Sequence, residues 1–268
     1  MLHRWLQNWQ LWREARALRR HQIPDPLWQL TLLHYPFLQR LSATEAAQLR
    51  RMSSLFLARK EFHGAGGFQV SDEVAVAIAA QACLPILHLG LQAYDGFVGI
   101  VVHAGEVVAQ REHVDEDGIV HQYEEELAGE AMEGGPLMLA WSELSPDPLD
   151  SDAVYNVVIH EFAHVLDMQD GQADGVPPLP RAEREAWLAV LESEWGAFCE
   201  VVDAGEDTLL DPYGAEAPEE FFAVACEAFF VAPADLLHEH PALYALLASY
   251  FRQDPAAAAP KPAGRNSP

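Results

Sequence analysis

The sequence contains little positive charge. Its 268 residues include 16 Lys and Arg against 41 Asp and Glu, which gives a formal net charge of -25 at pH 7. Nucleic-acid binding needs clustered basic side chains that neutralise phosphates, so this balance argues against a direct nucleic-acid partner. Between residues 61 and 251 only Arg111, Arg181 and Arg184 are basic, whereas 37 residues are acidic. The main part of the chain is therefore strongly anionic.

Cysteine and long apolar runs are scarce as well. Cys83, Cys199 and Cys226 are far apart in the sequence and offer neither a disulfide framework nor a Cys-x-x-Cys metal site, so free thiols in a reducing compartment are expected. The first 20 residues lack the continuous apolar core of a signal peptide. The longest apolar run, Val74 to Leu87, is shorter than the ~20 residues that cross a bilayer. We expect a cytoplasmic protein without a membrane span.

The two ends of the chain differ in composition from the middle. Residues 1–20 hold five Arg and place Leu and Trp at helical spacing, which predicts a basic amphipathic helix or arm. This segment either packs its apolar face on the domain, forms a loose arm, or binds a membrane surface or a partner. Residues 254–268 are rich in Pro and Ala without apolar periodicity, which predicts a disordered tail. Residues 21–253 are expected to form the globular domain.

Within that domain, helical patterns surround a group of short alternating segments. The alternating segments predict strands at 97–103, 107–113, 119–123 and 137–141, and the glycine-rich segment 62–68 predicts a turn. Ser42-x-x-Glu45 is typical of a capping box. This order predicts an α+β fold that is mainly helical and has a small sheet. The predicted helices are two or three within 27–56, then 72–83, 153–169, 181–202, 217–231 and 240–252.

One segment has the pattern of a metal site. In Val157-Val-Ile-His160-Glu161-Phe-Ala-His164-Val-Leu-Asp167, the two histidines are one helical turn apart, so both imidazoles can bind a single Zn²⁺. Glu161 follows the first histidine and can deprotonate a water at that ion. About 0.05 matches to His-Glu-x-x-His are expected by chance from 12 His and 25 Glu in this length. The segment therefore predicts a zinc site.

A catalytic zinc ion usually has three protein ligands and one open position. The downstream segment Pro218-Glu-Glu220-Phe-Phe-Ala-Val-Ala-Cys-Glu227 places two carboxylates on one helix face, two turns apart. Our preferred assignment is Glu220 as the third ligand and Glu227 as the carboxylate that orients a ligand imidazole. The exchanged assignment is the alternative. Asp167 and Asn156 lie where each could hydrogen-bond near a ligand imidazole or pack the helix.

These two segments resemble those of the Mlc titration factor A family of zinc metallopeptidases, whose catalytic core is similar to that of anthrax lethal factor. Further similar stretches are Ile78-Ala-Ala-Gln-Ala-Cys83 and Gly129-Glu-Ala through Trp141. The resemblance implies a gluzincin-like, zincin-like metallopeptidase domain over residues 21–253, with the small sheet packed beside the His-Glu-x-x-His helix. It also implies that Glu220 is the third ligand and that Tyr213, seven residues earlier, assists the transition state.

The resemblance suggests two functions of different classes. The first is a zinc-dependent peptidase, either an endopeptidase or an aminopeptidase, that uses Glu161 as general base on a peptide or protein substrate. The second is a regulatory protein that sequesters a glucose-responsive repressor of sugar uptake, with or without catalysis. The segment Pro136–Trp141 is expected to be either a sheet edge that pairs with an extended substrate or an interior strand. A metal-free structural protein is the remaining alternative.

Overall fold

The computed structural model describes residues 12, 14–105, 107–114, 120–127, 129–131, 134–142 and 154–258. The predicted α+β class is confirmed, because helices predominate around a four-stranded sheet. Residues 14–20 of the predicted N-terminal helix are helical, Trp12 is exposed, and residues 1–11 and 13 lie outside the described residues. No helix within the described ranges has both the length and the apolarity that crossing a membrane requires.

The first group of helices comes from the N-terminal third of the chain. It consists of α2 (Asp25–His34), the 3-10 helix η1 (Pro36–Arg40), α3 (Ala43–Leu57) and α4 (Asp72–Cys83). The predicted capping box starts α3: the Ser42 hydroxyl accepts a hydrogen bond from Glu45 N, and Ser42 N donates one to Glu45 Oε2 at 3.0 Å. Ser71 caps α4 as predicted, by accepting a hydrogen bond from Val74 N. The sequence therefore determines both helix starts locally.

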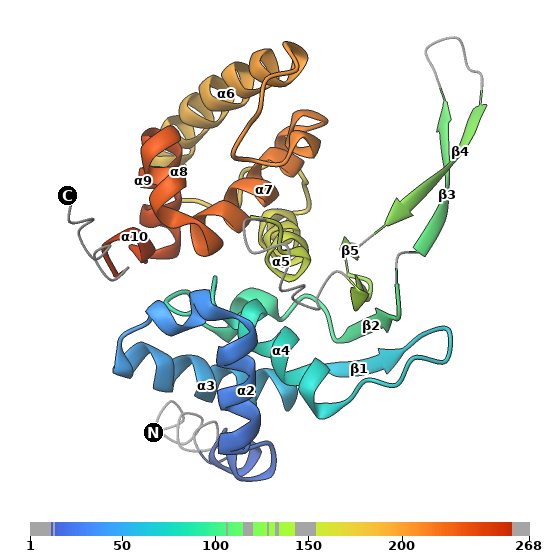
Figure 1. Cartoon of the computed structure of the whole chain (residues 1–268), viewed down its shortest axis with the longest axis vertical. Coiled ribbons are helices and arrows are strands. Elements are labelled where there is room, and N and C mark those ends of the chain that lie inside the picture. Colours follow the sequence, from blue (N-terminus) through green and yellow to red (C-terminus); the bar gives the residue numbers. More distant parts are fainter. Residues whose placement is uncertain are drawn as a thin grey trace, which may run out of the picture.

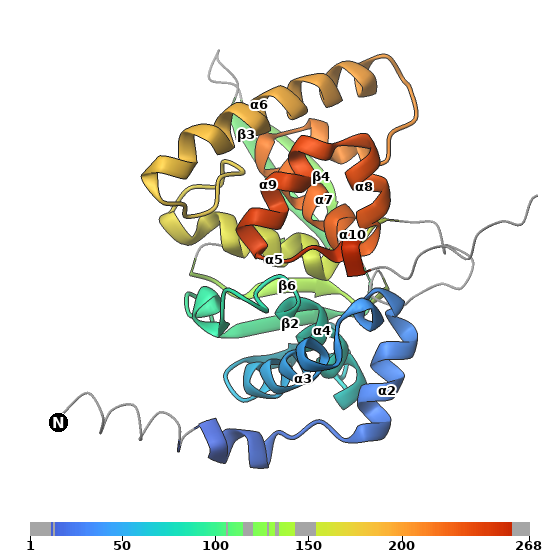
Figure 2. The same ribbon diagram turned by 90° about the vertical axis from the view of Figure 1, so that its left-hand side faces the viewer.

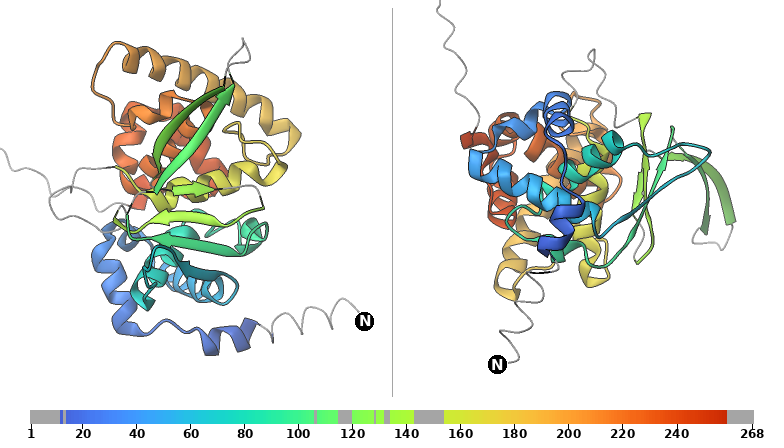
Figure 3. Two further views of the ribbon diagram at one scale, coloured as in Figure 1. Left: turned by 90° about the vertical axis from the view of Figure 1, so that its right-hand side faces the viewer. Right: turned by 90° about the horizontal axis from the view of Figure 1, so that it is seen from below.

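The sheet has the strand order β1-β2-β6-β5 and lies along one side of α4 and α5 (Figures 1 and 3). Its strands are β1 (Glu61–Gly64), β2 (Gly99–His103), β5 (Gly129–Ala131) and β6 (Leu137–Ala140). β1 and β6 both run parallel to β2, whereas β5 is antiparallel to β6. On β2, Ile100 and Val102 are fully buried while the alternating Gly99, Val101 and His103 are half-buried, so one face of the sheet packs on the helices.

The structure differs from the predicted strands at several places. Residues 61–64 form β1, although we expected a turn over 62–68. The turn follows at Gly64, where a Cβ would overlap the backbone of Phe68. The edge strand β5 was not predicted. Leu137–Ala140, for which edge and interior positions were both open, is interior between β2 and β5. The predicted strands near 107–113 and 119–123 form a separate antiparallel hairpin, β3 (Val107–Val114) with β4 (Val120–Leu127).

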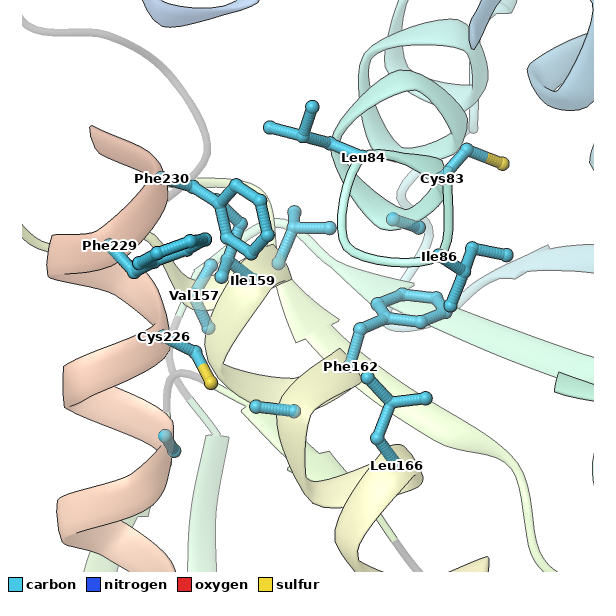
Figure 4. Packing of buried hydrophobic residues seen from close by; sticks show 14 of the residues in the cluster. Cys83, Leu84, Ile86, Val157, Ile159, Phe162, Leu166, Cys226, Phe229 and Phe230 are labelled. Carbon is cyan, nitrogen blue, oxygen red and sulfur yellow. The ribbon is translucent and has the colours of Figure 1, made fainter. Parts of the chain in front are cut away.

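The central helix α5 (Val157–Asp167) lies between the first group of helices and a second one (Figures 1 and 2). The second group contains α6 (Arg181–Asp203), η5 (Pro212–Ala215), α7 (Pro218–Val231), α8 (Pro233–Glu239) and α9 (Pro241–Phe251). Figure 4 shows α5 side chains extending toward Ile86, after α4, and toward Phe230 on α7. Phe162 on α5 meets the rings of Phe56, Tyr94 and Phe97. Burial on both sides fixes α5 within the core.

The predicted C-terminal tail is only partly described. Residues Pro255–Ala258 form a short helix, α10, and residues 259–268 lie outside the described residues. The Tyr244 hydroxyl donates to Asp254 Oδ1 at 2.6 Å and accepts from Ala256 N at 3.0 Å. Residues 254–258 therefore differ from the predicted disorder, because a tyrosine from α9 supplies their hydrogen bonds.

Candidate metal centre

Helix α5 brings His160 and His164 together as the spacing predicts. Their ring centroids are 4.8 Å apart and their Nε2 atoms 3.1 Å apart. The helix begins at Asn156, whose side-chain oxygen accepts a hydrogen bond from Ile159 N at 3.0 Å. The predicted start at residue 153 is therefore too early, since this N-cap stops the helix four residues before His160.

The carboxylate of Glu220, on α7, completes the cluster. Its Oε2 atom lies 3.0 Å from His160 Nε2 and 3.3 Å from His164 Nε2. Tetrahedral zinc with bonds of 2.0–2.1 Å separates its ligand atoms by about 3.3 Å, so the three atoms already stand close to one face of such a tetrahedron. Two imidazoles and one carboxylate are also a donor set that catalytic zinc uses. Within the described residues, this is the group of three side chains that could bind a metal ion.

Glu227 lies behind His160, two turns after Glu220 on α7. His160 Nδ1 donates a hydrogen bond to Glu227 Oε1 at 2.8 Å, which leaves the Nε2 lone pair directed at the cluster. The backbone N of Asn156 donates to the other oxygen of Glu227. Glu227 is 2% exposed, and these two donors balance its buried charge. Glu220 thus lies at the cluster and Glu227 behind it, and their roles as ligand and orienting carboxylate stay a prediction.

The charges in this cluster favour a cation. Burial alone would lower the pKa of His160, but the hydrogen bonds to Glu220 and Glu227 raise it to about 10. Burial would raise the pKa of Glu220, whereas the two imidazoles lower it to about 2. Both shifts have the same cause, because two carboxylates stabilise positive charge at the position between them. A divalent ion and protons compete for this position.

Glu161 is held between α5 and the edge strand β5. It is 5% exposed, and its Oε2 atom has no hydrogen-bond partner among the described residues. A Cβ on Gly129 would overlap the Glu161 side chain, so only glycine allows β5 to approach this closely. Burial raises the pKa of Glu161 to about 7. A buried carboxylate without a partner, beside a cation site, has the features of a general base.

Tyr213 lies near the ligands on the 3-10 helix η5. Its ring centroid is 6.3 Å from that of His160, and the side chain is 39% exposed. The turn is fixed by Tyr213 N, which donates to Asp211 Oδ1 at 2.9 Å, and by Trp195 Nε1, which donates to Gly214 O at 3.1 Å. The structure therefore places Tyr213 beside His160, and its role in the transition state stays a prediction.

Two roles were open for Asp167, and in the structure it packs the helix and does not bond a ligand imidazole. Its Oδ2 atom accepts from Gly175 N at 2.8 Å, and its Oδ1 atom has no partner in the described part of the chain. Gly175 O accepts from Trp187 Nε1 at 2.9 Å, and a Cβ on Gly175 would lie 2.6 Å from Pro218 O, at the start of α7. Asp167 thus holds a glycine that sets the spacing between α5 and the helix of Glu220.

The side chain of Asn156 connects the site to α4. Its Nδ2 donates to Gln81 Oε1 at 2.7 Å, and Gln81 is fully buried. We did not predict roles for Gln81, Gly129 or Gly175. Gln81 could have been recognised from the sequence as the one amide side chain in the apolar run of α4, since a buried polar side chain needs a hydrogen-bond partner. Nothing local in the sequence identified the two glycines, because their role depends on segments far along the chain.

Comparisons with known proteins give the family of this chain. The family described as glucose-regulated metallo-peptidase M90 matches residues 9–252. An uncharacterized protein of Synechocystis is 37% identical over 92% of this chain and 90% of its own length. A protein of Pectobacterium atrosepticum named Mlc titration factor A is 36% identical over 86% of this chain and 87% of its own length. Another of that name from Salmonella arizonae is 34% identical, covering 87% and 93%.

Replacement of Gly175 by alanine should weaken metal binding. The added Cβ needs the space of Pro218 O and should shift the start of α7, and with it Glu220. Affinity for Zn²⁺, measured by competition with a chelating dye, should fall roughly 10- to 100-fold. The matched control is Gly205→Ala, since Gly205 also has a positive φ but nothing lies near its added Cβ. Equal affinities in the two variants would contradict this role of Gly175.

Replacement of Asp167 by asparagine should change how stability depends on pH. Burial raises the pKa of Asp167 from 3.8 to about 6, so the folded chain retains a proton that the unfolded chain loses near pH 4. Wild-type protein therefore loses stability from about pH 4 to about pH 6. The free energy of unfolding of Asp167→Asn, relative to wild type, should rise over this range in chelator-treated protein. Asp207→Asn, at an exposed site, is the control; a flat difference for Asp167→Asn contradicts the expectation.

Proposed function

Because the chain belongs to the glucose-regulated metallo-peptidase M90 family, we propose that it is a zinc-dependent peptidase with His160, His164 and Glu220 as the metal ligands. The main supporting observation is that three donor atoms, one from each of these side chains, lie 3.0–3.3 Å apart. Glu161, the proposed general base, directly follows the first ligand in the sequence. Zinc at this position supplies Lewis-acid chemistry: it acidifies a water and polarises a carbonyl.

The protein's own residues then move the protons. Glu161 accepts the proton of the attacking water and later gives it to the leaving amine. Glu227 keeps the proton of His160 on Nδ1, so the imidazole stays in one tautomer and one orientation. Tyr213, beside His160, donates a hydrogen bond to the oxygen on which negative charge develops. We assign no further catalytic group.

The edge strand β5 gives the substrate a place to bind. Among the described strands, β5 is at an edge of the sheet and pairs with β6, and an extended substrate peptide would lie along this side of the sheet. Gly129 places this edge against Glu161. Either an endopeptidase or an aminopeptidase could use it.

A second role concerns regulation. Two of the relatives named above are called Mlc titration factor A, so we propose that this chain also binds a repressor of that type. A cytoplasmic location suits such a partner and remains a prediction, as does the reducing compartment expected for the free cysteines. The two roles can be separated, because one needs proton transfer by Glu161 and the other needs only a surface.

Replacement of Glu161 by glutamine tests the peptidase mechanism. The amide cannot accept the proton of the water, so kcat should fall roughly 10²- to 10⁴-fold in a peptide-hydrolysis assay. Zinc content and any repressor binding should stay at the wild-type level, since Glu161 is not a proposed ligand. Glu216→Gln, at an exposed carboxylate four residues before Glu220, is the control. Unchanged turnover in Glu161→Gln would rule out this mechanism.

The ligand assignment is tested by zinc content. Glu220→Ala removes one of three donor atoms and should leave the purified chain with little zinc by elemental analysis. Glu227→Ala should retain zinc with roughly 10- to 100-fold lower affinity, and Glu227→Gln should recover part of that loss because its amide oxygen accepts from His160. Loss of zinc in Glu227→Ala together with full retention in Glu220→Ala would exchange the two roles.

A further inference from the structure

Gln81 is a buried amide that the proposed mechanism does not use. It is fully buried on α4, where the other residues from 74 to 83 are Val, Ala, Ile and Cys. The other buried acid, amide or histidine side chains in the described part of the chain lie in or beside the metal centre: His160, Glu161, Asp167 and Glu227. An amide in an apolar helix loses its hydration and needs partners, so its hydrogen bonds indicate its role.

Two backbone groups fix how the amides of Gln81 and Asn156 are oriented. Ile159 N can only donate, so the Asn156 oxygen faces it at 3.0 Å, and the Asn156 nitrogen donates to Gln81 Oε1 at 2.7 Å. Ala77 O can only accept, so the Gln81 nitrogen faces it at 3.2 Å. The Tyr35 side chain, buried between α2 and η1, is a further hydrogen-bond partner of Gln81. Gln81 is thus a fixed acceptor for Asn156.

The backbone of Asn156 contacts both His160 and Glu227. Its carbonyl oxygen accepts from His160 N at 3.0 Å, and its own N donates to Glu227 Oε2. Glu227 in turn accepts from His160 Nδ1 at 2.8 Å. A shift of Asn156 would therefore change the contact that orients a ligand imidazole. Among the hydrogen bonds that Asn156 makes within the described ranges, the one to Gln81 comes from outside α5 and α7.

Helix capping does not account for the amide nitrogen of Asn156. An N-cap needs only an acceptor, and the hydroxyls of Ser42 and Ser71 supply it at the starts of α3 and α4. Asn156 caps α5 with its oxygen in the same way, and its nitrogen donates to Gln81. The second contact therefore has a purpose other than starting the helix.

We propose that Gln81 is a positioning residue of the metal centre, which holds Asn156 so that Glu227 keeps the His160 imidazole directed at the ion. Gln81 acts through Asn156 and is not itself a ligand. This inference rests on the zinc site of the proposed function, and it does not require that the chain cleaves peptides. Loss of the Gln81 amide should weaken zinc binding in a chain that remains folded.

The test is a double-mutant cycle on Zn²⁺ affinity. Affinity is measured on the full-length protein by competition with a chelating dye, at a temperature where circular dichroism shows every variant folded. Gln81→Met keeps the length of the side chain without the amide and should bind roughly 3- to 10-fold more weakly, less than the loss expected for Glu227→Ala. Asn156→Ser keeps a cap on α5 but lacks the donor to Gln81, and should show a similar loss.

The double variant decides whether Gln81 acts through Asn156. In the Asn156→Ser chain, Gln81→Met should change the affinity less than about twofold further, because the contact is already absent. Wild-type affinity in Gln81→Met, or losses that add in the double variant, would overturn the inference. If Gln81→Met does not fold, Asn156→Ser decides alone, and wild-type affinity in that variant overturns the inference.

A matched control separates positioning from general packing. The fully buried Ser53 donates to Leu49 O at 2.8 Å and lies 3.4 Å from Ala79 O on α4, away from the metal centre. Ser53→Ala should lower the melting temperature and leave the zinc affinity and the visible absorption of the Co²⁺-loaded chain at wild type, whereas Gln81→Met should change both. An equal loss of affinity in Ser53→Ala would overturn the inference.

The same titrations distinguish this inference from the proposed function. If wild type binds no zinc, the proposed function and the role of Gln81 both fail. If wild type binds zinc and Gln81→Met binds it equally well, only the role of Gln81 fails.

Discussion

The hydrogen bonds of Glu227 are the interaction on which the rest of the site depends. One buried carboxylate accepts from His160 Nδ1 and from the backbone N of Asn156, so it joins α7 to the first turn of α5. A carboxylate at 2% exposure is stable only with such donors, and they in turn fix the ligand imidazole. Because Glu220 is on the same helix, the contact that orients His160 also places the third donor atom. His160 and Glu220 are therefore positioned together by one hydrogen-bonded contact between α5 and α7.

Close approach of backbones is the second constraint. Gly129 allows β5 to lie against Glu161, and Gly175 lies between Asp167 and the start of α7. A Cβ on Gly214, in η5, would lie 2.7 Å from the side chain of Val224 on α7. At each position a side chain would push apart two segments that carry site residues. Asp167 belongs to this framework, because it holds Gly175 and not an imidazole. The geometry of the centre thus depends on residues that have no chemistry of their own.

The metal centre and an adjacent cavity differ in charge. At the ligands, two carboxylates concentrate negative charge and favour a dication. Along β5, two residues after Gly129, Ala131 lines a cavity that has no charged side chain in its lining. None of the chain's large negative charge lines the cavity.

The sequence by itself determined what is local. Helical periodicity places His160, Glu161 and His164 on one stripe of α5, Ser42 and Ser71 start their helices, and the spacing of Glu220 and Glu227 puts both on one face of α7. It did not determine which strand forms the edge, since β5 has only three residues and no alternation long enough to read. It also missed Gln81 and the glycines. Only the tertiary structure decided these points, because a sheet edge, the partner of a buried amide and a close backbone contact each depend on residues distant in the sequence.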